Sequence, residues 1–308
     1  MRKSPTKQPA NGAGRSRFIP LCIAGLTCFV VATILGYGAW YLFGTHKEDN
    51  RRGQTVVVTQ VTPTPAPTST PAPRVVLAPA GEVFVEGGEV VLGDGEQVPF
   101  RRDFVQSFYI GETEVTNEQY RDFIRETGHN APTGWTNNDF PAGAANEPVT
   151  RITWRDAVAY CDWLTQKLGV RVRLPTEAEW ERAAKGKENF RYPWGNEWRD
   201  RAADCEENKG RVRAVKSFPE NRSPFGAYDM AGNVWEWVAD EARDEQGNTL
   251  TQDGVTLRVI KGGAATEPRA FISNSARYFV PEDKGAMSLG FRYVIERRPP
   301  VQTPESRP

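Results

Sequence analysis

Apolar side chains recur at helical spacing in three segments between residues 116 and 186, and each segment opens on a threonine. Thr116, Thr153 and Thr176 are each followed three positions later by Gln, Asp or Glu, the spacing of a capping box at the start of a helix. Gly186 marks the end of the third segment. The positions that we expect to face the core are Tyr120, Phe123, Ile124, Ala157, Tyr160, Cys161, Leu164, Trp180, Ala183 and Ala184.

The rest of this region predicts short strands and turns. Residues 81–88 and 106–111 are strand-like and are broken by glycine. Residues 187–292 are rich in turn residues and show no long periodic segment. Nine tryptophans occur, and all but Trp40 lie within residues 135–237, which is where we expect a dense core. The pattern predicts an α+β domain with few regular elements.

Residues 18–43 form an apolar run without a charged residue. A membrane-spanning helix needs about 20 such residues, whereas the apolar part of a cleaved signal peptide has only about 7–15. Residues 1–17 are basic and contain no acid, so the positive-inside rule predicts a cytoplasmic N-terminus. We therefore predict a single-pass signal anchor in the cell membrane, with the C-terminal domain extracytoplasmic.

Composition divides the remaining chain. Residues 44–74 contain a Pro/Thr tract that favours extended backbone, and they predict a stalk. Residues 75–296 form the predicted globular domain, and the proline-rich residues 297–308 a disordered tail. Lys and Arg number 39, as do Asp and Glu, so the zero net charge gives no support for a nucleic-acid partner.

Residues 225–237, FGAYDMAGNVWEW, place acids among tryptophans and glycines. Asp229 and Glu236 can supply carboxylate oxygens, and the glycines allow backbone carbonyls to turn toward a shared point. Such a group of oxygens suits Ca²⁺. The residue types alone also fit a tight turn in which the tryptophans are core and the acids are solvated.

Several longer motifs resemble the formylglycine-generating enzyme family, also called the sulfatase-modifying factor family. They are YIGETEVTNEQY (109–120), PVTRITWRDAVAYCDWL (148–164), RLPTEAEWERAAKG (173–186), YPWGNEW (192–198), YDMAGNVWEW (228–237) and GFR (290–292). The resemblance implies the formylglycine-generating-enzyme subtype of the C-type-lectin-like fold, braced by structural calcium. It implies a Ca²⁺ site made by the side chains of Asp229 and Glu236 and the carbonyls of Gly232 and Val234. A second site is implied near residues 204–208, without assignable ligands.

The family's founding reaction uses O₂ and a Cu(I)-binding cysteine pair to oxidise a sulfatase cysteine to formylglycine. Cu(I) requires soft thiolate ligands. The corresponding stretch, KGGAATEPRAFISNSAR (261–277), contains no cysteine, so we expect no copper. Iron-dependent branches of the family use histidines, and this chain has only His46 and His129.

The domain contains two cysteines, Cys161 and Cys205, and they do not replace the missing copper-binding pair. Cys161 matches a family disulfide position whose usual partner is Tyr293 here, which favours a buried free thiol. A disulfide between Cys161 and Cys205 stays open, because the oxidising side of the membrane permits it. We expect Cys205 to lie away from the copper position.

We therefore predict a non-catalytic binding or sensory module for an unknown extracellular ligand, which could be a glycan, a peptide or a protein. The expected contact residues follow Gly263 and are Arg269, Phe271, Asn274, Arg277 and Tyr278. Two alternatives are a formylglycine-generating oxidase that acts on sulfatase cysteines through displaced thiols, and a structural component of a cell-envelope complex.

Overall fold

The computed structural model describes residues 81–96, 98–208 and 210–296. The predicted basic arm, signal anchor, stalk and tail lie outside these residues. Within the described ranges, none of the helices has the length and apolar character needed to cross a membrane.

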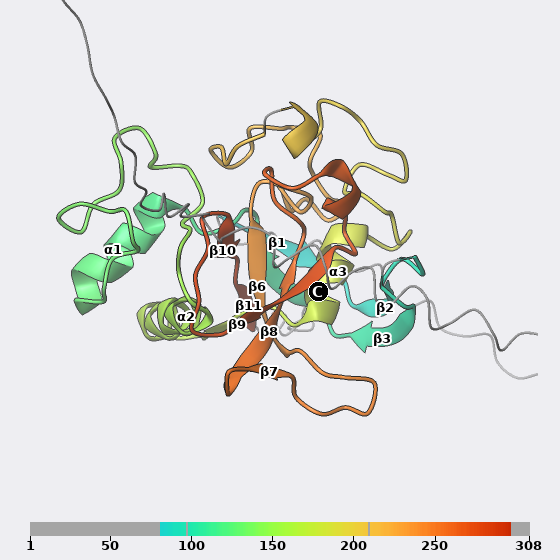
Figure 1. The fold of residues 1–308 in the computed structure, drawn as a ribbon, viewed down its shortest axis with the longest axis horizontal. Coiled ribbons are helices and arrows are strands. Elements are labelled where there is room, and N and C mark those ends of the chain that lie inside the picture. Colours follow the sequence, from blue (N-terminus) through green and yellow to red (C-terminus); the bar gives the residue numbers. More distant parts are fainter. Residues whose placement is uncertain (1–80, 97, 209, 297–308) are drawn as a thin grey trace, which may run out of the picture. The chain divides into compact units, whose positions relative to one another are not determined.

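Three α-helices form where the sequence predicts them. They are α1 (Asn117–Thr127), α2 (Trp154–Leu168) and α3 (Glu177–Lys185), with short 3₁₀ turns η1 (Glu206–Asn208) and η2 (Arg269–Phe271). Each α-helix has a complete capping box, in which the threonine hydroxyl and the side chain at the third helical position both accept backbone N–H groups. Figure 1 shows α1 and α2 on one side of the central strands and α3 on the other.

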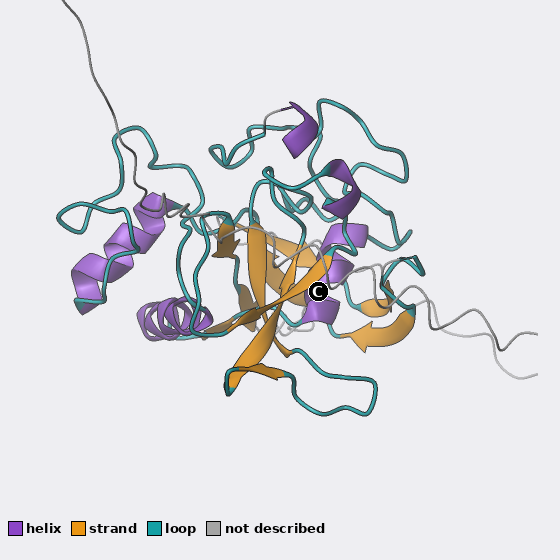
Figure 2. Cartoon of the chain, viewed as in Figure 1, coloured by secondary structure: helices purple, strands orange, loops and turns teal. Residues whose placement is uncertain are grey.

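Two sheets and a hairpin complete the domain. One sheet has the order β1 (Glu82–Val85), β4 (Phe108–Gly111), β11 (Val294–Glu296), β5 (Arg171–Arg173). The other contains β10 (Leu289–Phe291), β6 (Trp235–Glu241), β8 (Val255–Lys261) and β7 (Thr251–Gln252), with β9 (Arg277–Pro281) also paired to β8. Strands β2 (Gly88–Leu92) and β3 (Arg101–Val105) form the hairpin. Long loops join these elements (Figure 2).

The two longest described strands were not predicted from the sequence. Strands β6 and β8 lie in the region that we expected to be turn-rich and without a long periodic segment, and they pair antiparallel at the centre of their sheet. The Val255–Lys261 segment is rich in β-branched residues, which was the available signal. The Trp235–Glu241 segment gave no comparable signal for a strand, because its aromatic and acidic residues fitted a turn equally well.

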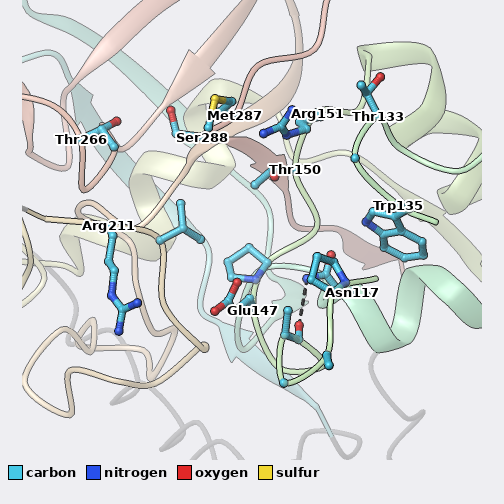
Figure 3. Close-up of a pocket in the computed structure, with 17 residues that line it drawn as sticks. Asn117, Thr133, Trp135, Glu147, Thr150, Arg151, Arg211, Thr266, Met287 and Ser288 are labelled. Carbon is cyan, nitrogen blue, oxygen red and sulfur yellow. Dashed lines mark hydrogen bonds between the residues drawn. The ribbon is translucent and has the colours of Figure 1, made fainter. Parts of the chain in front are cut away.

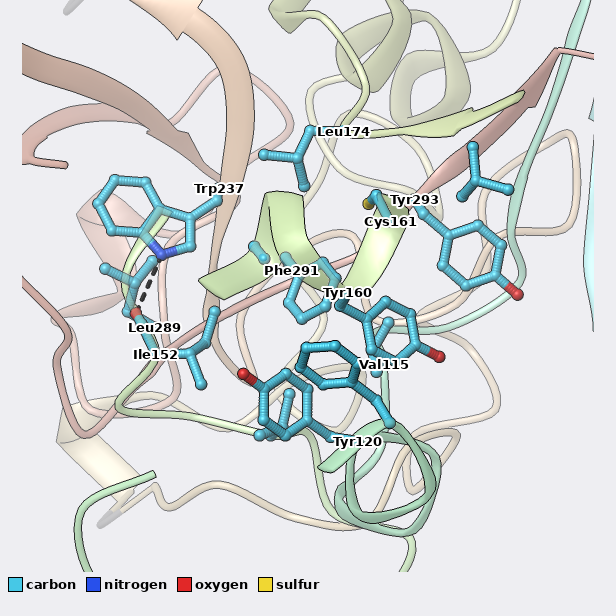
Figure 4. Packing of buried hydrophobic residues seen from close by; sticks show 14 of the residues in the cluster. Val115, Tyr120, Ile152, Tyr160, Cys161, Leu174, Trp237, Leu289, Phe291 and Tyr293 are labelled. Carbon is cyan, nitrogen blue, oxygen red and sulfur yellow. Dashed lines mark hydrogen bonds between the residues drawn. The ribbon is translucent and has the colours of Figure 1, made fainter. Parts of the chain in front are cut away.

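The helical positions predicted to be internal pack into the core. All of them are buried except Leu164, which is partly buried against the same cluster. Tyr120 and Tyr160 stack with their ring centroids 5.9 Å apart, and Phe291 lies edge-on to Tyr160 at 5.3 Å (Figure 4). Trp237 donates its indole N–H to the Ile152 carbonyl oxygen at 3.2 Å. The aromatic core therefore joins α1 and α2 to strands β6 and β10.

Arg292 joins the two sheets. It lies between β10, in one sheet, and β11, in the other, and it is completely buried. Its Nε and Nη2 atoms each donate to Glu236 of β6 at 2.7 Å. The remaining donors reach the carbonyl oxygens of Gly111, at the end of β4, and Tyr228. Trp180 of α3 donates to the same Glu236 carboxylate at 2.9 Å. One guanidinium therefore connects both sheets, with α3 attached through the shared carboxylate.

Replacing Arg292 tests this connection. We expect Arg292→Met to lower the free energy of unfolding by about 3–5 kcal/mol, because it leaves the Glu236 carboxylate buried without its cation. Urea-induced unfolding followed by tryptophan fluorescence measures the change. The control is Arg171→Met, which breaks an exposed pair with Glu296 and should cost less than about 1 kcal/mol. Equal losses in the two variants would contradict the role of Arg292.

Candidate functional site

The predicted calcium segment forms a tight turn directly before β6. Asp229, Gly232 and Asn233 all have left-handed backbone conformations, with φ of 58°, 90° and 57°. Asp229 is buried and accepts the Lys216 backbone N–H on Oδ2 at 2.7 Å. Glu236 is buried as well, but both of its oxygens already accept hydrogen bonds from Arg292. The turn therefore brings the implied ligands into one region, and Glu236 is bound there by a protein cation.

The charges around this turn favour a further cation. Three buried carboxylates, those of Glu114, Asp229 and Glu236, surround the single guanidinium of Arg292. Burial raises the pKa of Glu114 well above its usual range, and it raises the pKa of Asp229 to about 6. The Glu114 Oε2 atom has no hydrogen-bond partner among the described residues. One guanidinium does not balance this group when all three carboxylates are ionised.

The donor set fits calcium in part. None of the turn and loop hydrogen bonds of the described residues ends on the carbonyl oxygen of Gly232 or Val234. These two oxygens and the Asp229 carboxylate are hard ligands of the kind that Ca²⁺ prefers. Glu236, however, would have to share its charge with Arg292. In the described ranges, no three His, Cys, Asp or Glu side chains lie together as a metal-binding group. The calcium site therefore stays a prediction.

The resemblance implies a second calcium site near residues 204–208, and an arginine lies beside this region. Asp204 pairs with the guanidinium of Arg213, and the Glu207 carboxylate accepts the Arg269 backbone N–H at 3.0–3.1 Å. The second implied site stays a prediction.

The five predicted contact residues have different surroundings. Asn274 is fully buried and donates its amide to the carbonyl oxygens of Ala184 and Phe190, so it holds a loop and is closed to a ligand. Arg277 pairs with buried Glu177 at 2.7 Å. The other three are surface residues, namely Arg269, Phe271 and Tyr278.

A cleft of about 770 Å³ lies beside this segment. Its lining residues come from the first residue of α1, from the loop between α1 and α2, from the loop before β10 and from two further loops. They are Asn117, Thr133, Gly134, Trp135, Pro141, Ala142, Gly143, Ala144, Glu147, Pro148, Thr150, Arg151, Arg211, Val212, Thr266, Met287 and Ser288. Figure 3 shows Arg151 and Arg211 on different sides of the space, with Glu147 and Thr150 between them. Only Thr266 comes from the 261–277 segment.

Backbone contacts fix the position of Arg151. Its φ of 62° is left-handed, a conformation that is costly for a residue with a side chain. Its N–H donates to the Ala286 carbonyl oxygen at 2.9 Å. Gly285 lies so close that a Cβ there would meet the Arg151 carbonyl carbon at 2.6 Å. The 285–288 loop therefore holds the strained turn and also supplies Met287 and Ser288 to the cleft.

The two described cysteines, Cys161 and Cys205, are buried and are not joined by a disulfide. This confirms the expectation of an unpaired thiol at Cys161, whose pKa is raised by burial, and it answers the open question of a disulfide between Cys161 and Cys205. The expected position of Cys205 was wrong. Its side chain packs with Ile272 and Ala231, directly against the segment in which the family carries its copper ligands. Its place in the chain gave no indication of this contact, because it depends on the fold of two loops.

Comparison with known proteins decides the family. Residues 66–297 match the family model described as "Sulfatase-modifying factor enzyme 1-like domain". The chain belongs to this sulfatase-modifying factor family.

Relatives of this sulfatase-modifying factor domain include proteins named as enzymes and proteins named as inactive. A formylglycine-generating enzyme of Mus musculus is 29% identical over 309 residues, covering 76% of this chain and 79% of that protein. A mouse protein named "Inactive C-alpha-formylglycine-generating enzyme 2" is 28% identical over 277 residues, covering 71% of this chain and 85% of that protein. The solved structure of PvdO from Pseudomonas aeruginosa has a TM-score of 0.58 at 25% identity, covering 70% and 94% of the two chains.

Most residues that line the cleft could not be predicted from the sequence. Trp135 and Arg151 come from the loop between α1 and α2, Arg211 comes from the loop after η1, and none belongs to a motif with a known chemical role. The only local signal was the Gly- and Pro-rich loop of residues 131–148, which predicts a turn but does not indicate what it encloses.

The left-handed turn at Arg151 gives a direct test. We expect Arg151→Gly to keep or raise the free energy of unfolding, by up to about 1 kcal/mol, because glycine adopts positive φ without the steric penalty. Arg151→Val should lower it by about 1–2 kcal/mol, because a β-branched side chain is strained there. Chemical denaturation of the two variants checks the order. A glycine variant less stable than the valine variant would contradict the turn geometry.

Proposed function

We propose that this protein is a membrane-anchored, extracytoplasmic binding module that uses the scaffold of the family without its oxidase chemistry. The observation that carries the proposal is the lining of the cleft. Among the described residues that form it, none is a cysteine or a histidine. Thiolate and imidazole are the ligands that the family's copper and iron chemistry requires. The polar groups that remain suit binding.

The proposed topology rests on residues outside the described part. Residues 18–43 have the length and composition of a membrane span, and the basic residues before them favour a cytoplasmic N-terminus. Residues 44–74 would then hold the domain away from the bilayer as a stalk. This arrangement presents a binding domain to the space outside the membrane.

The second candidate is an oxidase, and one observation favours it. Cys205 packs against Ile272, within the segment where the family carries its copper ligands. A single buried thiol lacks the second soft ligand of a Cu(I) pair, because Cys161 belongs to a different core cluster. Binding therefore remains the better-supported function.

An activity assay separates the two candidates. The purified full-length protein, supplied with copper, O₂ and a cysteine-containing sulfatase peptide, should produce no formylglycine above the background without protein. Mass spectrometry of the peptide detects the aldehyde. Turnover that disappears in Cys205→Ser and persists in Cys161→Ser would establish an oxidase and overturn the proposal.

We further propose a structural Ca²⁺ held by Asp229 and the carbonyls of Gly232 and Val234, beside Glu236. The excess of buried carboxylates over Arg292 supports it. The ion would neutralise charge that the fold otherwise buries uncompensated, so it stabilises the native state.

Thermal unfolding tests the calcium proposal. At a Ca²⁺ concentration of about 100 times Kd, binding to the native state adds about 2.7 kcal/mol to its stability, so the midpoint should rise above that measured with chelator. Asp229→Asn keeps an oxygen ligand and tolerates the left-handed backbone, but it should reduce the shift. Identical midpoints of the wild-type protein in saturating Ca²⁺ and in chelator would contradict the proposal.

A further inference from the structure

The cleft contains two arginines without a carboxylate partner. No described Asp or Glu forms an ion pair with Arg151 or Arg211, although most other arginines of the domain have such a partner. Among the described residues of the lining, Glu147 is the only acidic one. Two guanidinium groups and one carboxylate give the cleft a positive balance in a chain whose net charge is zero.

Arg151 occupies its position at a cost to stability. Its left-handed backbone favours glycine, and close approach of Gly285 fixes the turn. Strained residues of this kind concentrate at functional sites. The substitution Arg151→Gly would relieve the backbone strain and would also remove the guanidinium from the cleft. It therefore separates ligand binding from folding stability, because it should weaken binding without lowering stability.

The rest of the lining is suited to a polypeptide. Trp135 is partly buried against Tyr120 and Phe140, which holds its ring in place. Met287, also in the lining, is 70% exposed, and its flexible thioether can adapt to an apolar side chain. Trp, Met and Arg are the residues enriched in protein interfaces. Arginine forks recognise carboxylates in two-point contacts.

We propose that the cleft binds an acidic peptide segment of a partner protein. Arg151 and Arg211 each take a carboxylate of the ligand, and an apolar ligand residue between the acids packs on Trp135 and Met287. Glu147 weakens this binding by like-charge repulsion. The inference rests on the proposed binding function and names the chemical class of its ligand.

Differential selection tests the ligand class. The full-length protein in nanodiscs of neutral phosphatidylcholine is used to select from a random decapeptide display library, in parallel with an Arg151→Gly/Arg211→Gln variant. We expect the wild-type protein to enrich peptides with two or more Asp or Glu residues around an apolar residue, and the variant to lose this enrichment. The sequence positions of the acids then report the separation of the two arginines.

Titration of the most enriched peptide provides the quantitative arm. We expect each single substitution, Arg151→Gly and Arg211→Gln, to weaken binding at least tenfold, and Glu147→Gln to strengthen it two- to fivefold. Replacing the peptide's acids by amides should weaken binding to the level of the double variant. Arg201→Gln, at an exposed arginine outside the cleft, is the matched control and should change nothing. Thermal unfolding of Arg151→Gly confirms that its loss of binding is not a loss of folding.

The contradicting outcomes distinguish the two proposals. Enrichment of neutral or basic peptides, with binding still lost in Trp135→Ala, would overturn the acidic ligand and leave the binding function standing. Arginine-dependent binding of a sulfated hexasaccharide, with no peptide enriched, would replace the peptide by an acidic saccharide. Failure of all these probes to bind at millimolar concentration would overturn both the ligand and the cleft as a binding site.

Discussion

The fold depends on one buried ion pair, between Arg292 and Glu236. Arg292 stands at the point where the chain passes from one sheet to the other, and its donors reach β6, the end of β4 and the turn before β6. A buried guanidinium is stable only when nearly all of its donors are satisfied, so the pair fixes the relative positions of these elements. Glu114 and Asp229 are buried beside the same pair, so three carboxylates surround one guanidinium.

A core fixed in this way leaves the surface loops free to differ. The cleft is built from loops that join the fixed elements, with the strained turn at Arg151 held by the loop before β10. Changes in such loops alter what the site contains without altering the sheets. The segment after Gly263 illustrates this: it keeps its place beside the core through Ile272, and it carries no thiol in this chain. The relatives of this chain include proteins named as enzymes and proteins named as inactive.

The sequence predicted the parts of the fold that depend on local interactions. The three helices are capped by Thr116, Thr153 and Thr176 as expected, because a capping box uses only residues three positions apart. The motifs also predicted the family, because each motif is a continuous run of residues that can be identified in the sequence alone. Strand β6 was missed because its pairing with β8 and β10 decides its conformation, and those partners are distant in sequence.

The candidate site was the hardest part to predict. Asn274 and Arg277 have side chains typical of recognition surfaces, yet tertiary contacts bury one and pair the other with Glu177. Cys205 reaches Ile272 only through the folding of two loops. The unpaired arginines of the cleft could be identified only after every other ion pair was known, since sequence does not show which arginine lacks a partner.

The central claim is that this domain binds a ligand and does not hold catalytic copper. The most direct measurement is titration of the reduced full-length protein with Cu(I) in competition with a chromophoric chelator, in parallel with Cys205→Ser. The account predicts that the wild-type protein and the variant withdraw equal, small amounts of Cu(I) from the chelator. Withdrawal of one equivalent by the wild-type protein, lost in Cys205→Ser, would show a copper site and contradict the account.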